Sequence, residues 1–136
     1  AALDGVHALT DVTGFGLAGH ALEIARGADC TVHIDWAQVP LLPGVRDLAG
    51  QGLVTGASGR NWAAYGADVV LPVGFTPPEQ ALLTDPQTSG GLLVSCAPEA
   101  LDSVLAIFQR HGFDRAGVVG RHRHGQGGPR ASQAAG

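Results

Sequence analysis

A short apolar run that leads at once into an amphipathic helix constrains the fold of this chain most. Residues 91–96 form a continuous apolar stretch, and Pro98 follows where helices commonly begin. The helix should run through His111. One of its faces should carry the apolar residues Leu101, Val104, Leu105 and Phe108. A buried strand followed by a one-faced helix predicts a layered domain in which helices pack on a sheet.

Further segments alternate between helical and extended patterns. Helices are expected at residues 17–26, 45–53 and 77–83, and strands at residues 30–35, 68–73 and 116–121. The turn-forming stretch Thr55–Asn61 is expected to be a loop, followed by one or two helical turns to Tyr65. Irregular spacing and long loops argue against a doubly wound parallel sheet, so we predict an α+β fold with a mixed sheet.

The length and composition fit one domain with one core. The chain has 136 residues, of which 45% are hydrophobic. Residues 125–136 are rich in Gly and Ala and poor in large apolar side chains, which predicts a disordered tail after a domain at 1–124. Methionine is absent and the sequence opens on Ala1-Ala2-Leu3, so we expect a piece of a longer protein.

Charge and cysteine content exclude several classes of function. The net charge is −4 and there is no lysine, so we expect no nucleic-acid partner. No segment has the pattern of a signal peptide or of a bilayer-spanning helix, which predicts a soluble cytoplasmic protein without a membrane partner. Cys30 and Cys96 each lie in an apolar stretch, as buried thiols do.

The segment Thr10–Gly16 brings a carboxylate, hydroxyls and glycines together directly before a helix. Glycines let a backbone approach a ligand, and a helix start favours phosphate. Asp11 can supply a hard oxygen to Mg²⁺. On spacing alone, an ordinary turn in which Thr13 or Asp11 caps the helix is the better interpretation.

Two further polar segments are candidates for ligand binding. Thr84–Gly91 places several hydrogen-bonding side chains and a Gly pair before a strand, although a tight turn is the better interpretation of its composition alone. Arg60 and Asn61 offer a guanidinium and an amide beside glycine, which suits phosphate recognition but also a solvated loop. The histidines lack metal-ligand spacing, and His20 is expected on an exposed helical face with Glu23.

Together these motifs resemble the C-terminal domain of the selenophosphate synthetase (selenide, water dikinase) family. The resemblance rests on three segments in the same order, which are His7–His20, Gly56–Asn61 and Asp85–Gly91, and continues to Val118-Val119-Gly120. It implies a fold like that of the aminoimidazole ribonucleotide synthetase C-terminal domain. The family usually ends on a strand, which the tail composition here argues against.

The resemblance also implies a reaction and a division of labour. It implies phosphoryl transfer from ATP to selenide with Mg²⁺, giving selenophosphate, AMP and orthophosphate, in a homodimer whose N-terminal domain supplies the nucleophile. Asp11 corresponds to a metal ligand, and no catalytic residue is expected in this chain, which should be inactive alone. Possible phosphate or cleft-lining residues are Thr10, Thr13, Gly14, Gly16, Arg60, Asn61, Thr88, Ser89 and Gly90.

Two other functions stay open from the sequence. A sibling ATP-dependent synthetase or kinase of the same fold group is one, although the segment Asp85–Gly91 argues against it. A stand-alone binding module that keeps the fold without catalysis is the other.

Overall fold

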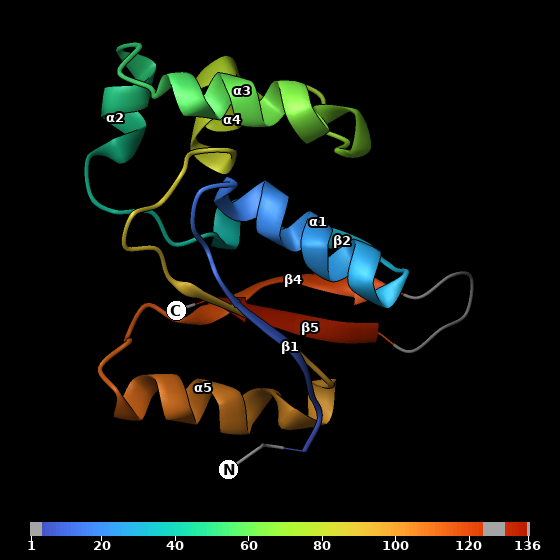
Figure 1. The fold of residues 1–136 in the computed structure, drawn as a ribbon. Helices are drawn as coiled ribbons and strands as arrows, with labels where there is room; N and C mark the ends of the chain where they lie inside the picture. The colour runs from blue at the N-terminus through green and yellow to red at the C-terminus, as the bar shows by residue number, and fades with distance from the viewer. Residues whose placement is uncertain (1–3, 124–129, 136) are drawn as a thin grey trace. The chain divides into compact units, whose positions relative to one another are not determined.

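The computed structural model of the chain describes residues 4–123 and 130–135 (Figure 1). The chain divides into two compact units, and the expected single domain at residues 1–124 stays a prediction. The first unit comprises Ala1–Asp11, Glu23–Pro40 and Gly91–Gly136, and the second comprises Val12–Leu22 and Leu41–Gly90. One boundary between them falls within helix α1 (Gly16–Ala28), and each unit is described below by itself.

The first unit is built on a five-stranded sheet in the order β1-β3-β5-β4-β2. Its strands are β1 (Val6–Asp11), β2 (Thr31–Ile34), β3 (Leu92–Cys96), β4 (Gly117–Arg123) and β5 (Arg130–Ala135). The predicted α+β class is confirmed. All four strand pairs are antiparallel, however, so the predicted mixed pairing was wrong. Hydrophobic patterning locates strands, but it carries no information about their relative direction.

Strand β5 lies where we predicted a disordered tail, so that prediction was wrong for Arg130–Ala135. The strand pairs with β3 on one side and with β4 on the other. The prediction considered only the apolar side chains, whereas a central strand also satisfies its backbone groups along both edges. The rest of the predicted tail lies outside the described residues.

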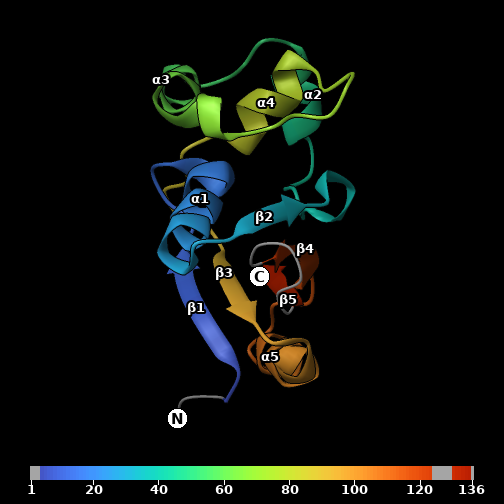
Figure 2. The same cartoon turned by 90° about the vertical axis from the view of Figure 1, so that its right-hand side faces the viewer.

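Helix α5 (Leu101–Arg110) packs against the sheet and forms the core of the first unit (Figures 1 and 2). Its buried residues Val104 and Phe108 share one cluster with Val94 and Cys96 of β3. A 3₁₀ turn, η3 (Pro98–Ala100), leads into the helix. The predicted strand and amphipathic helix are therefore confirmed.

The register of β1 against β3 sorts the motif residues by face. Thr10 pairs with Leu93, whereas Asp11 pairs with Leu92, which packs against the α5 core. Paired residues share a face, and successive residues of a strand point to opposite faces. Thr10 and Asp11 therefore lie on opposite faces of the sheet.

The second unit contains three helices besides the start of α1, namely α2 (Val45–Gly50), α3 (Gly56–Tyr65) and α4 (Pro77–Leu83). Helix α4 has the predicted bounds. It begins with a capping box in which Thr76 and Glu79 satisfy each other's backbone N–H groups, and Pro77 occupies the first turn.

Two predictions in this unit were wrong. Residues 55–61 were expected to be a loop, but α3 begins at Gly56 because Thr55 caps it by accepting a hydrogen bond from Ser58 N–H. Residues 68–73 were expected to be a strand, but Asp68 ends the 3₁₀ turn η2 (Gly66–Asp68) and residues 69–73 form no strand. Pro72 lacks an N–H for a strand ladder, and no described strand pairs with the segment.

Candidate functional site

Two motif segments that are seventy residues apart in sequence pack together in the second unit. We name Val12–Gly16 the first loop and Thr84–Gly90 the second loop. Gln87 N–H donates to Thr13 O at 3.0 Å, which links the loops through their backbones. A Cβ on Gly90 would lie 1.8 Å from Val12 O, so only glycine fits there. The sequence candidates in these loops therefore belong to one structural element.

Asn61 of α3 connects both loops with one side chain. Its Nδ2 donates to Gly14 O at 2.9 Å and to Thr84 O at 2.9 Å. We predicted that Asn61 lines a phosphate cleft, whereas in the structure the two hydrogens of its amide bind backbone carbonyls of the protein.

Tyr65, one turn further along α3, holds the next carbonyl of the first loop. Its hydroxyl donates to Phe15 O. Burial raises the pKa of Tyr65, so the hydroxyl keeps its proton and acts as a donor. Tyr65 was predicted only as part of a short helix, and its contact with the loop was not foreseen.

His20 supports the first loop from α1. Its Nε2 accepts a hydrogen bond from Thr13 N–H at 3.0 Å and lies 3.2 Å from Thr13 Oγ1. The side chain is buried, so the prediction of an exposed position was wrong. His20 lies four residues before the buried Ile24, and this spacing places both side chains on one helical face.

Asp85 connects the second loop to the start of α3. Its Oδ1 accepts a hydrogen bond from Thr55 Oγ1 at 3.1 Å and lies 3.2 Å from Ser58 Oγ. Its Oδ2 accepts one from Gln87 Nε2 at 3.1 Å. The carboxylate therefore organises the N-terminus of α3 and the second loop together.

These contacts turn three successive carbonyls of the first loop, those of Thr13, Gly14 and Phe15, towards other parts of the second unit. In a trans peptide the N–H of the next residue points opposite to the carbonyl. The Gly14 N–H therefore points away from Gln87, which binds the Thr13 carbonyl. The Phe15 N–H likewise points away from Asn61, which binds the Gly14 carbonyl. Two such donors at the start of a helix form an arrangement suited to an anion.

The remaining predicted cleft residues of the second unit are distributed around these loops. Gly16 has φ +71° and would place a Cβ 2.6 Å from the backbone of Thr84, so glycine is required there. Thr88 and Ser89 are exposed on the second loop, and Arg60 is exposed on α3. Their side chains are accessible to a ligand, unlike the buried side chains of His20 and Tyr65.

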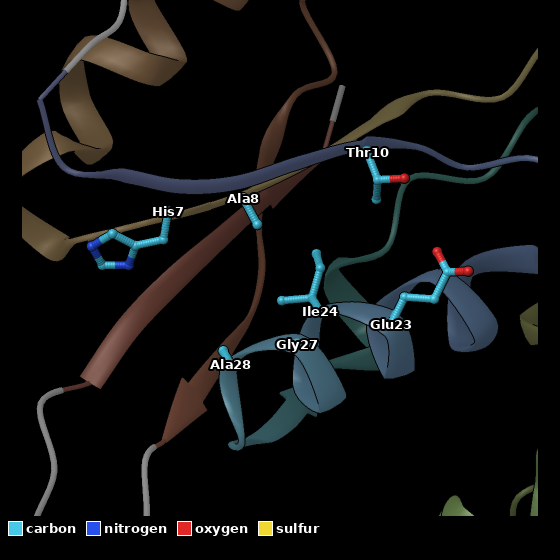
Figure 3. Close-up of a pocket in the computed structure, with 7 residues that line it drawn as sticks. All are labelled: His7, Ala8, Thr10, Glu23, Ile24, Gly27 and Ala28. Carbon is cyan, nitrogen blue, oxygen red and sulfur yellow. The ribbon is translucent and has the colours of Figure 1, made fainter.

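The first unit contains the other two candidates, Thr10 and Asp11. Asp11 is exposed at the end of β1. Thr10 instead lines a cavity of about 350 Å³ between β1 and the last turns of α1, with His7 and Glu23 among its polar residues (Figure 3). The two neighbours therefore face different surroundings: Asp11 is exposed, whereas Thr10 is half-buried at the cavity.

Among the described residues there is neither a group of metal ligands nor a pair of bonded cysteines. Within residues 4–123 and 130–135, no cluster of three or more His, Cys, Asp or Glu side chains could hold a metal ion. Both cysteines are free, as predicted, but only Cys96 is buried, whereas Cys30 is half-buried. Burial raises the pKa of the Cys96 thiol. In the described part of the chain, no helix has the length and apolar character needed to span a bilayer.

Comparison with known proteins assigns the family. Residues 1–129 match the model described as AIR synthase related protein, C-terminal domain. The chain belongs to this family. It is 67% identical over 120 residues to the selenide, water dikinase of Burkholderia orbicola (strain MC0-3), and 61% identical over 125 residues to that of Pseudomonas straminea. These alignments cover 88% and 92% of the chain but only 34% and 35% of the relatives, so the chain spans about a third of their length.

The family assignment agrees with the fold and with the motifs that the sequence singled out. The sequence interpretation named Asp85 only as part of a candidate loop, and it missed the supporting roles of His20, Tyr65 and Asp85. The spacing of His20 from Ile24 was a usable signal, and so was the Thr55–Ser58 pair as a helix cap. The long-range partners of Tyr65 and Asp85 had no signal in the local sequence.

Proposed function

We propose that this chain is the C-terminal third of a selenide, water dikinase, an enzyme that makes selenophosphate from selenide and ATP and releases AMP and orthophosphate. The observation that carries the proposal is the high identity, over most of this chain, to relatives that bear this name. The rest of the enzyme, including its N-terminal domain, supplies the nucleophile. The full-length enzyme is a cytoplasmic homodimer in this proposal.

The two loops of the second unit bind the polyphosphate of ATP. The backbone N–H groups of Gly14 and Phe15 supply donors, and the exposed Thr88, Ser89 and Arg60 supply side-chain groups. Phosphoryl transfer depends mainly on positioning and charge neutralisation. Loops that are fixed by internal hydrogen bonds before ATP arrives suit this task.

Asp11 is the metal ligand that this chain contributes. Its carboxylate is an exposed hard oxygen donor, which fits Mg²⁺, and the described residues supply no second and third ligand beside it. The other ligands therefore come from ATP and from the N-terminal part. Bound Mg²⁺ neutralises charge on the phosphates that react.

The test is turnover of the full-length enzyme, in which the upstream sequence precedes this chain. We expect selenide-dependent AMP formation, and we expect Asp11→Ala to abolish it while the melting temperature is retained. Asp4→Ala, an exposed aspartate before β1, is the matched control and should keep activity. Undiminished turnover in Asp11→Ala would sink the metal assignment, and a wild-type enzyme without selenide-dependent AMP formation would sink the proposed function.

A further inference from the structure

The Asn61 amide donates a hydrogen bond to a backbone carbonyl of each loop. The acceptors, Gly14 O and Thr84 O, are each 2.9 Å from Nδ2. The two hydrogens of a planar amide diverge in fixed directions, so one rigid group sets the separation of two carbonyls. Asn61 is itself half-buried; its bond to Thr84 O is partly buried, and its bond to Gly14 O is exposed.

We propose that Asn61 is a positioning residue that holds the two loops in register for the phosphates of ATP. This inference rests on the proposed function. Asn61 acts through the peptide between Gly14 and Phe15, because fixing the Gly14 carbonyl also fixes the direction of the Phe15 N–H. Asn61 itself does not contact the reacting atoms.

We name the two hydrogen bonds from Asn61 Nδ2 to Gly14 O and Thr84 O the clamp. The clamp requires an amide at position 61, because both bonds need a donor. Asn61→Asp keeps the shape of the side chain but replaces the Nδ2 donor with a carboxylate oxygen. This oxygen faces the carbonyl oxygens of Gly14 and Thr84 and repels both. In Asn61→Ala, both carbonyls lose this donor without the repulsion. The aspartate variant is therefore expected to disturb the loops more than the smaller alanine variant.

Steady-state kinetics of the full-length enzyme test the proposal. We expect Asn61→Asp to lower kcat/KM for ATP about 100-fold, the scale of a displaced positioning group. The KM for ATP should rise while the KM for selenide stays unchanged. A residue that only stabilises the fold would lower kcat with the folded fraction and leave the KM for ATP unaltered.

A matched control separates the clamp from the charge change. Gln109→Glu makes the same amide-to-carboxylate change at an exposed position on α5, and we expect it to leave both KM values and kcat unchanged. An Asn61→Asp enzyme with the KM for ATP of the wild type would overturn the proposal, as would a Gln109→Glu enzyme with an equal rise.

Amide hydrogen exchange reports on the clamp independently of activity. The Thr13 N–H donates to His20 Nε2 of α1, and the N–H groups of Gly16 and Gln87 both donate to Thr13 O. We expect Asn61→Asp to speed their exchange in both loops together, at least tenfold, with no change in Gln109→Glu. If the wild type lacks dikinase activity but exchange behaves as expected, the proposed function fails while the clamp stands. Unchanged exchange in Asn61→Asp overturns the clamp even if the wild type is active.

Discussion

Helices α5 and α3 have ten residues each but are held in place by different interactions. Helix α5 has no side-chain cap at its start, and it is anchored by buried apolar residues such as Val104 and Phe108. Helix α3 begins with the Thr55 cap, and its side chains Ser58, Asn61 and Tyr65 bind groups in other segments of its unit.

This difference indicates that the apolar residues of α5 mainly stabilise the fold, whereas the hydrogen-bonding residues of α3 mainly position the loops. Apolar burial is strong but has little directionality, so it holds α5 without specifying each contact closely. Hydrogen bonds contribute less net free energy, but they fix direction. We therefore expect changes under α5 to cost stability, and changes in α3 to alter the loops at a smaller cost.

The largest expected effect comes from removing the aromatic anchor of α5. Phe108→Ala should lower the free energy of unfolding by about 3–5 kcal/mol, because it leaves a cavity in the core. Urea unfolding measures the loss. Phe113→Ala is the control, since this ring is 48% exposed and should cost clearly less. Equal losses for the two phenylalanines would contradict the assignment of the core.

Reaction of Cys96 with a thiol reagent sharpens this prediction. Cys96 belongs to the same cluster, and burial raises its pKa, so the folded protein should react slowly in a Cys30→Ser background. Phe108→Ala should speed the reaction because the core opens more often. A wild-type rate equal to that of an unfolded peptide would show that the thiol is not enclosed.

Gly90→Ala should have the next largest effect. A Cβ at this position would meet the carbonyl of Val12 in the first loop, so the backbone must shift, at about 3 kcal/mol. Gly59→Ala is the matched control on α3, where a Cβ meets nothing within 4 Å. It should stabilise the protein by up to about 1 kcal/mol through helix propensity. Thermal unfolding measures the stability of both variants. A Gly90→Ala protein as stable as the wild type would contradict the packing of the two loops.

The smallest expected effect concerns the cap of α3. Thr55→Ala should cost about 1 kcal/mol, because Ser58 N–H loses its acceptor and Asp85 loses a donor. Thr55→Ser keeps the hydroxyl and should recover most of the loss in urea unfolding. A serine variant as unstable as the alanine variant would show that the methyl group, and not the cap, matters.

The same contrast explains what could be predicted from the sequence. The strand β3 and helix α5 were predicted because apolar periodicity records burial directly. The last turn of helix α3, up to Tyr65, was predicted, but its start at Gly56 was missed because the small and polar residues there resemble a loop until the partner Asp85 is known. Strand β5 was missed because its place between two strands depends on pairing and not on its own composition.

The candidate site divides in a similar way. Asp11 and the two loops were identified as motifs, and their role in binding ATP stays a prediction. Their mutual arrangement in the second unit could not be read from spacing, since Asn61 joins segments 47 and 23 residues away. His20 was placed on the wrong face because its polarity outweighed its spacing from Ile24.

The most direct test of the clamp between the loops is the exchange of the Asn61 side-chain amide, measured by NMR. Both Nδ2 hydrogens are bound to carbonyls, so they should exchange at least tenfold more slowly than the exposed amide of Gln109. Exchange of Asn61 at the rate of Gln109 would show that the amide does not join the loops, and would contradict the account of how they are held together.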